Sequence, residues 1–299
     1  MSHPAAVFEE AAPLDHELRR GRLLLLLAAT LWSLAGVFIK FLSLPPLTIV
    51  FYRSFFASIF FAFFLKKSAS LPRTALLVSM LSYAAAISAF VSANKITTAA
   101  SAIALQYTAP IFVFVISHFL FREKIAGVSW ISLLLGMVGI AVICAGSAGQ
   151  PDVAGVVIAL LSGLLFSVYM VSLRFVKGVN PGTLTFLNNI ACCFLLLPFV
   201  QSQLALSLNE GWIVAVMGVV QLGIPYWLFS KGLERIQLQE ASLILLIEPV
   251  LNPIWVALVI GEVPSLATLI GGSLIVLGVG ARYLWQLLSK TADRNNQTG

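Results

Sequence analysis

Ten apolar stretches constrain the fold of this chain more than any other feature of its sequence. Each has about 20 residues, the length that an α-helix needs to cross the roughly 30 Å hydrocarbon core of a bilayer. They cover residues 23–43, 47–65, 74–93, 99–120, 128–146, 155–173, 183–204, 211–229, 240–259 and 265–286. We therefore predict an all-α membrane protein with ten transmembrane helices, joined by short connections.

The composition excludes the main soluble classes. The chain is 60% hydrophobic and 10% charged, whereas soluble domains carry about 25% charged residues. Too little polar surface remains to cover a globule in water, so we expect neither a soluble enzyme nor a nucleic-acid binder.

The Lys and Arg residues indicate the orientation in the membrane. With a cytoplasmic N-terminus, all but three of the 18 fall in cytoplasmic segments. Lys40 and Lys95 then lie outside, and Arg53 lies within a span. Because basic residues accumulate in cytoplasmic loops, we predict that both termini are cytoplasmic.

The two halves of the chain look like copies of each other. The matching elements, first half against second, are Leu31-Trp32-Ser33 with Leu165-Phe166-Ser167, Lys40 with Arg174, Pro46-x-Thr48-x-x-Phe51 with Pro181-x-Thr183-x-x-Phe186, and Pro110-x12-Glu123 with Pro249-x12-Glu262. Five spans per half make the second half enter the membrane from the opposite side, which is the inverted repeat of many secondary transporters. We predict a cytoplasmic tail at 1–21, repeats at 22–146 and 155–286, and a second cytoplasmic tail at 287–299.

These features carry a family resemblance. Ten spans in two five-helix repeats, the Pro-x12-Glu endings and the Trp32-Ser33 turn resemble the EamA-type members of the drug/metabolite transporter superfamily, over about residues 22–286. Overall the chain is most similar to the bacterial aromatic amino acid exporters. Gly261-Glu262 keeps the family's usual Gly-Glu pair, whereas the first repeat departs from it with Arg122-Glu123. The resemblance implies an exporter of small organic solutes in the bacterial inner (plasma) membrane, with aromatic and other neutral amino acids as the first candidates.

Glu248 is the sharpest candidate for contact with a solute. It lies about nine residues into its span, roughly 14 Å deep at 1.5 Å per residue, and acids in mid-span are costly and often functional. Glu248, Asn252 and Trp255 recur at i, i+4 and i+7 and so share one helix face. Pro249 and Pro253 remove backbone donors and can open that helix. The alternative is that Glu248 caps or pairs inside the bundle.

Arg53 is the second charged candidate. It lies about six residues into its span, roughly 9 Å deep, within reach of Glu248, and an Arg53–Glu248 pair would be structural or a gate. The alternative for Arg53 is snorkelling to the headgroups. Lys40 is nearer a helix end, so snorkelling is favoured there. We interpret Glu123 and Glu262 as structural residues at helix ends.

Further polar and aromatic residues in the spans complete the predicted substrate site. Gln106 and Tyr107 precede Pro110 at the position that matches Glu248 in the other half. Trp32, Tyr83, Tyr169 and Gln221 are the remaining candidates. Tyr226 and Trp227 lie close to the cytoplasmic end, where such rings usually anchor a helix at the interface.

The motifs of other functional classes are missing from the sequence. It has no GxxxxGK[ST] loop for ATP, no HExxH, no zinc-type Cys/His spacing and no Gly-x-Ser-x-Gly. We therefore expect no cofactor, no metal and no enzymatic activity. The leading hypothesis is a secondary transporter in the lipid bilayer that exports a small molecule by alternating access around a midplane cavity. A proton is the candidate coupling ion. The alternatives are a broad metabolite or drug exporter, and a passive facilitator of amino acids without ion coupling.

Overall fold

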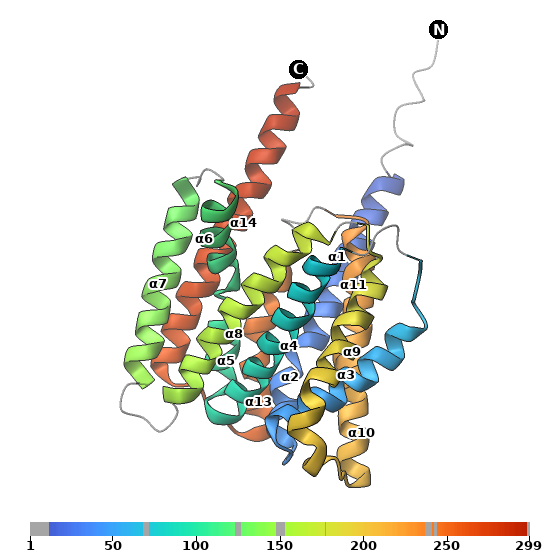
Figure 1. The fold of residues 1–299 in the computed structure, drawn as a ribbon. Coiled ribbons are helices and arrows are strands. Elements are labelled where there is room, and N and C mark those ends of the chain that lie inside the picture. Colours follow the sequence, from blue (N-terminus) through green and yellow to red (C-terminus); the bar gives the residue numbers. More distant parts are fainter. Residues whose placement is uncertain are drawn as a thin grey trace.

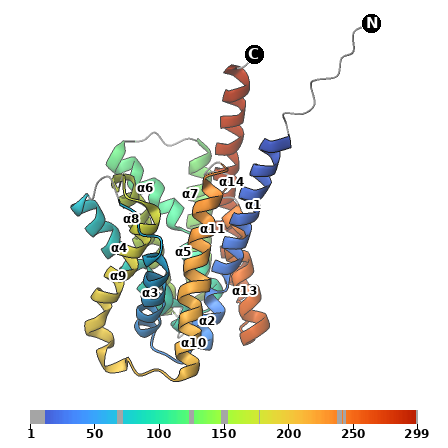
Figure 2. The ribbon, with the colours of Figure 1, turned by 90° about the vertical axis from the view of Figure 1, so that its right-hand side faces the viewer.

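The computed structural model describes residues 12–67, 72–122, 127–147, 153–176, 178–236, 241 and 244–297. Within these ranges every regular element is a helix and no strand occurs. The helices run alongside one another as a bundle, as Figure 1 shows. Figures 1 and 2 place the start of α1 and the end of α14 at one end of the bundle, and the start of α10 at the other.

The helices follow the predicted apolar stretches closely. They are α1 (Ala12–Ser33), α2 (Ala35–Phe41), α3 (Pro46–Ala62), α4 (Arg73–Ile96), α5 (Ala99–Gln106), α6 (Ala109–Phe121), α7 (Gly127–Ser147), α8 (Val153–Ser172), α9 (Pro181–Val200), α10 (Leu208–Val216), α11 (Ile224–Leu233), α13 (Ile247–Ile260) and α14 (Leu266–Gln297). Short 3₁₀ turns follow α8 and α9, and a π-helical segment, Met217–Gly223, joins α10 to α11. Both α1 and α14 extend into the predicted tails.

Length and composition show a multi-pass membrane protein. Among the described residues, seven helical segments are long and apolar enough to cross a bilayer, and three shorter apolar helices accompany them. The three shorter ones are Pro46–Ala62, Trp130–Gly146 and Ile247–Ile260. Each of the ten segments falls on one predicted stretch. Seven crossings are thus supported by length, and a total of ten stays a prediction.

Several helices are interrupted in the middle of a predicted span. Leu34 separates α1 from α2, Tyr107 and Thr108 separate α5 from α6, and α13 begins directly after Leu246. The last two breaks each lie two or three residues before a proline, Pro110 or Pro249, whose ring nitrogen cannot continue the hydrogen-bond ladder. Backbone of this kind is tolerated at membrane depth where it is buried in protein or lines a cavity.

Small residues allow the helices to approach closely. A Cβ atom added at Gly139 in α7 would lie 2.5 Å from the carbonyl oxygen of Gly271 in α14, and one added at Gly271 would lie 2.5 Å from that of Gly139. The two backbones therefore touch at this crossing, as small-residue contacts permit in membranes.

Candidate functional site

One hydrogen bond between the two halves of the chain joins a tyrosine to a glutamate. Tyr107 lies at the break between α5 and α6, and its hydroxyl lies 2.7 Å from Glu248 Oε2 and 3.0 Å from the carbonyl oxygen of Leu245. Leu245 is four residues before Pro249, so its carbonyl has lost its usual helical donor. A hydroxyl has one proton and can donate to one of these acceptors at a time. The structure thus joins two predicted site residues, one from each repeat.

Asn252 and Trp255 both donate hydrogen bonds to Ser33, the last residue of α1, just before the break between α1 and α2. Asn252 Nδ2 donates to the carbonyl oxygen of Ser33 at 3.0 Å, and Trp255 Nε1 donates to Ser33 Oγ at 3.0 Å. The predicted stripe therefore divides, because Glu248 contacts α5 while the other two residues hold α13 against α1. Asn252 is fully buried, and its Oδ1 has no hydrogen-bond partner among the described residues.

An aromatic cluster surrounds Trp32 at the end of α1. Its ring centroid lies 5.0 Å from that of Tyr226, edge to face, and 5.5 Å from that of Phe229. Gln221 Nε2 donates to the Trp32 carbonyl oxygen at 3.2 Å, while the buried Gln221 Oε1 has no partner in the described part of the chain. Trp32 and Tyr226 are both half-buried.

The interpretation of Tyr226 as an interfacial anchor was wrong. It packs against Trp32 in the interior, whereas its neighbour Trp227 is 40% exposed. The π-helical segment Met217–Gly223 lies just before it. A π-bulge shifts the facing of all residues that follow it, so a regular helical count from the sequence cannot place Tyr226.

Tyr83 and Tyr169 belong to a buried network between α4, α8 and α9. The Tyr83 hydroxyl donates to Asn189 Oδ1 at 3.2 Å, and Asn188 Nδ2 donates to the Tyr169 hydroxyl at 3.3 Å. Ser79 Oγ donates to Asn188 Oδ1 at 3.2 Å. Both asparagines thus form hydrogen bonds across helices. Tyr83 is 1% exposed, so it lies in the packed interior of the bundle.

Arg53 is enclosed at the centre of the bundle. It lies on α3 and is 3% exposed, and neither Nε nor Nη1 has a hydrogen-bond partner among the described residues. Its electrostatic neighbours are Tyr83, Tyr226, Cys192 and Glu248. Snorkelling to the headgroups is therefore not what the side chain does. The direct pair with Glu248 is not formed in this conformation either, and a pair that forms in another conformation stays a prediction.

Lys40 and Glu262 form an ion pair at the end of the bundle opposite the termini. Lys40 Nζ lies 2.7 Å from Glu262 Oε2 and donates to the Thr97 carbonyl oxygen at 2.7 Å. The backbone N–H of Ala99 donates to Glu262 Oε1 at 2.7 Å. The expected snorkelling of Lys40 is thus wrong, because a carboxylate and a carbonyl from other elements satisfy its ammonium group. This network joins α2, α4 and α5 to the residues after α13. Glu123, the counterpart of Glu262 in the first repeat, lies outside the described residues.

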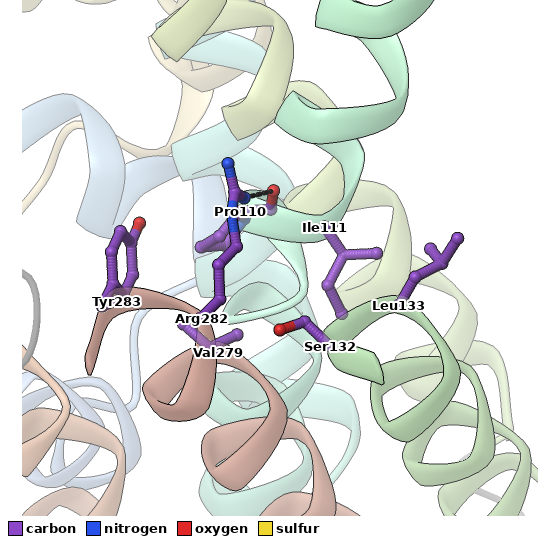
Figure 3. Close-up of a pocket in the computed structure, with 7 residues that line it drawn as sticks. All are labelled: Pro110, Ile111, Ser132, Leu133, Val279, Arg282 and Tyr283. Carbon is purple, nitrogen blue, oxygen red and sulfur yellow. Dashed lines mark hydrogen bonds between the residues drawn. The ribbon is translucent and has the colours of Figure 1, made fainter. Parts of the chain in front are cut away.

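One small cavity lies between α6, α7 and α14. Its volume is about 10 Å³, room for about one water molecule. Figure 3 shows the lining residues, which are Pro110, Ile111, Ser132, Leu133, Val279, Arg282 and Tyr283. Arg282 donates to the Pro110 carbonyl oxygen at 3.4 Å across it. This cavity is too small for an organic solute and differs from the predicted site.

Gln106, the last residue of α5, is half-buried.

Comparison with known proteins identifies the family. A model described as the EamA-like transporter family matches residues 19–145 and again residues 153–281. The chain belongs to the EamA-like transporter family. One match covers each half of the chain, in keeping with the internal repeat.

Among the described residues no group of three His, Cys, Asp or Glu side chains could hold a metal ion.

Relatives of this EamA-like protein are named as transporters. An "uncharacterized transporter" of Archaeoglobus fulgidus is 28% identical over 264 residues, which are 88% of this chain and 96% of the relative. YdfC of Bacillus subtilis is 28% identical over 197 residues, and YxxF of the same organism is 26% identical over 189. Those alignments cover 64% and 61% of the respective relatives.

A solved crystal structure has the same fold. It matches with a TM-score of 0.65 and 20% identity, over 89% of this chain and 97% of that chain. At this identity the likeness shows the fold alone. Together, family, relatives and apolar helices show a multi-pass membrane transporter.

Proposed function

We propose that this EamA-like transporter exports neutral amino acids, aromatic ones first, by alternating access between the two repeats. The observation that carries the proposal is a set of acceptors next to aromatic rings at the breaks of α1, α5 and α13. The carboxylate of Glu248 lies there, and Gln221 Oε1 and Asn252 Oδ1 are buried without a partner in the described chain. Buried polar atoms normally have partners, and an ammonium group of a solute would supply three donors.

The aromatic rings favour a solute with a large apolar side chain. Trp32 and Tyr226 are half-buried and lie beside Gln221, and Tyr107 lies beside Glu248. Such rings stack with another ring edge to face or offset, and their faces attract a cation. An apolar pocket with few polar groups is also the usual form of a small-molecule site.

Alternating access requires that one end opens while the other closes. The Lys40–Glu262 network holds α2 and α5 together at the end opposite the termini, the end predicted to be the outer one. We propose that this network is the outer gate, and that the solute enters from the cytoplasmic end while the gate is closed. Inverted repeats permit this exchange by a rocking motion about a central site.

A proton is the proposed coupling ion. Tyr107 can donate to Leu245 and Glu248 only in turn, but a protonated Glu248 could donate to Tyr107 while Tyr107 donates to Leu245. Both oxygen atoms would then be satisfied at once. A solute ammonium group and a proton would compete for the same carboxylate, which is a simple basis for exchange.

Counterflow in liposomes tests the proposed substrate class. Purified protein is reconstituted, the liposomes are loaded with one unlabelled amino acid of a panel, and uptake of labelled L-phenylalanine is followed. We expect aromatic amino acids to drive uptake faster than aliphatic ones. Absence of counterflow with every amino acid would refute this substrate class and favour the broad metabolite or drug exporter.

The same liposomes test coupling. With an imposed pH gradient, wild-type protein should accumulate L-phenylalanine above equilibrium, and the Glu248→Gln variant should not. Accumulation by that variant would refute the role of Glu248 in coupling. Equilibration without accumulation in the wild type would favour the passive facilitator.

A further inference from the structure

Arg53 is a buried cation with two guanidinium nitrogens that have no hydrogen-bond partner among the described residues. The side chain is 3% exposed, and the two nitrogens are Nε and Nη1. Enclosing a charge in this way is costly unless the charge is paired and hydrogen-bonded. A transporter that keeps this arrangement needs a compensating partner that arrives from outside the chain.

The repeat provides an internal comparison for this position. Pro46 matches Pro181 at an offset of 135 residues, and the same offset places Arg53 against Asn188. Asn188 is equally buried but satisfied, because it accepts from Ser79 and donates to Tyr169. The fold therefore does not require a cation at this depth in order to join its helices, and in the second repeat a neutral amide does so.

The groups within electrostatic range of Arg53 are Tyr83 from α4, Cys192 from α9, Tyr226 from α11 and Glu248 from α13. Glu248 is the acid among them, and its Oε2 accepts from Tyr107 instead. A positive and a negative group thus lie within electrostatic range of each other without contact, from two different repeats.

We propose that Arg53 binds the carboxylate of the transported amino acid while Glu248 faces its ammonium group. This inference rests on the proposed function. A guanidinium group binds a carboxylate through charge-assisted hydrogen bonds with defined geometry. A zwitterion bound in this way neutralises both buried charges, whereas an amine or an acid alone leaves one of them uncompensated. The site therefore selects α-amino acids over decarboxylated or amidated analogues.

The test compares two ligands that differ at the carboxylate. L-Phenylalanine and L-phenylalaninamide are used as competitors of labelled L-phenylalanine counterflow in liposomes. In wild-type protein the amide should compete at least about tenfold more weakly, which corresponds to about 1.4 kcal/mol. In Arg53→Gln the affinity for L-phenylalanine should fall to the level of the amide, while the affinity for the amide should not change. An equal loss for both ligands would overturn the proposal.

Thermal unfolding of the purified variants separates binding from folding. Because Nε and Nη1 of Arg53 have no hydrogen-bond partner in the described part of the chain, Arg53→Gln should unfold at the same or a higher temperature than wild type without ligand. Asn188→Ala is the matched control, since it removes a satisfied side chain at the equivalent position and should lower the unfolding temperature. A fall in Arg53→Gln as large as that in Asn188→Ala would show a structural arginine and overturn the proposal.

A third arm keeps this inference distinct from the proposed function. If wild-type protein shows no amino acid counterflow, the proposed function is wrong, and Arg53 is then tested with 3-phenylpropionate and its amide in the unfolding assay. Because a lone acid leaves Glu248 uncompensated, this arm uses the Glu248→Gln variant. Stabilisation of Glu248→Gln by the carboxylate but not by the amide, lost when Arg53→Gln is added, would support a carboxylate site, and no stabilisation of Glu248→Gln by this carboxylate would overturn it.

Discussion

Replacing Glu262 by glutamine should loosen the end of the bundle that lies opposite the termini. Glutamine has almost the same shape and keeps an oxygen for the backbone N–H of Ala99, which lies 2.7 Å from Glu262 Oε1. It removes the charge that attracts Lys40 Nζ, 2.7 Å from Oε2. Lys40 retains its hydrogen bond to the Thr97 carbonyl oxygen, so the substitution isolates the ion pair from the other contacts.

The size of the effect follows from the geometry. At 2.7 Å and an effective dielectric constant of about 20, two unit charges attract by roughly 6 kcal/mol. Lost hydration offsets most of this attraction, although the two side chains are still 16% and 22% exposed. A net contribution of about 1–3 kcal/mol is reasonable for such a pair, which corresponds to a shift of roughly 5- to 150-fold between closed and open states.

Labelling of a cysteine behind the ion pair measures this shift. Ala35 is 3% exposed and lies five residues before Lys40, roughly 7.5 Å along the helix. In a background without the three native cysteines, Ala35→Cys should react with a membrane-impermeant thiol reagent, added on that side, roughly 5 to 150 times faster in Glu262→Gln. Lys40→Met should give a similar increase, and the double variant little more.

Glu210→Gln is the matched control for this assay. Glu210 lies in the first turn of α10, which begins at the same end of the bundle, but it bonds only to Ser207 in the described chain. Its substitution should leave the labelling rate unchanged. Unchanged rates in both Glu262→Gln and Lys40→Met would refute the reasoning that this pair closes the outer end.

Three further substitutions test other contacts. Tyr107→Phe removes the hydroxyl that lies 2.7 Å from Glu248. A hydrogen bond to a charged group contributes about 1.5–3 kcal/mol, so transport of L-phenylalanine should fall by about tenfold or more. Unchanged transport in liposomes would show that this bond is dispensable. Gly139→Val places a branched side chain where Gly271 O would lie 2.5 Å from its Cβ, so the protein should unfold at a clearly lower temperature, and an unchanged transition would contradict the observed crossing. Trp255→Phe removes the indole donor to α1 and should destabilise the protein by about 1 kcal/mol, measured by thermal unfolding, without changing the preference for aromatic over aliphatic solutes.

The apolar stretches and the repeat predicted most of the fold. Membrane helices are selected by length and hydropathy, which a sequence displays directly. The repeat also placed Tyr107 opposite Glu248, and the structure joins the two by a hydrogen bond. The prolines at 249 and 253 predicted that the helix around Glu248 is opened, and α13 begins after a break at Leu246, because a missing backbone donor is a local property of the chain. The break before α6 was not predicted.

The partners of charged side chains could not be predicted in the same way. Lys40 is near a helix end, where snorkelling is the usual outcome, and its partner Glu262 is more than 200 residues away in sequence. The hydrogen bonds that Ser33 accepts from Asn252 and Trp255 depend on the packing of α1 against α13. The position of Tyr226 depends on the π-helical segment before it. Such contacts follow from tertiary packing rather than from local pattern.

Equilibrium binding of labelled L-phenylalanine to the purified protein tests the central claim most directly, since it does not depend on coupling or on the direction of transport. The account predicts saturable binding by wild type, displaced by aromatic amino acids before aliphatic ones, and at least about tenfold weaker binding in both Glu248→Gln and Arg53→Gln, about 1.4 kcal/mol each. Binding of unchanged affinity in both variants would contradict it, because the solute would then contact neither of these two charged groups.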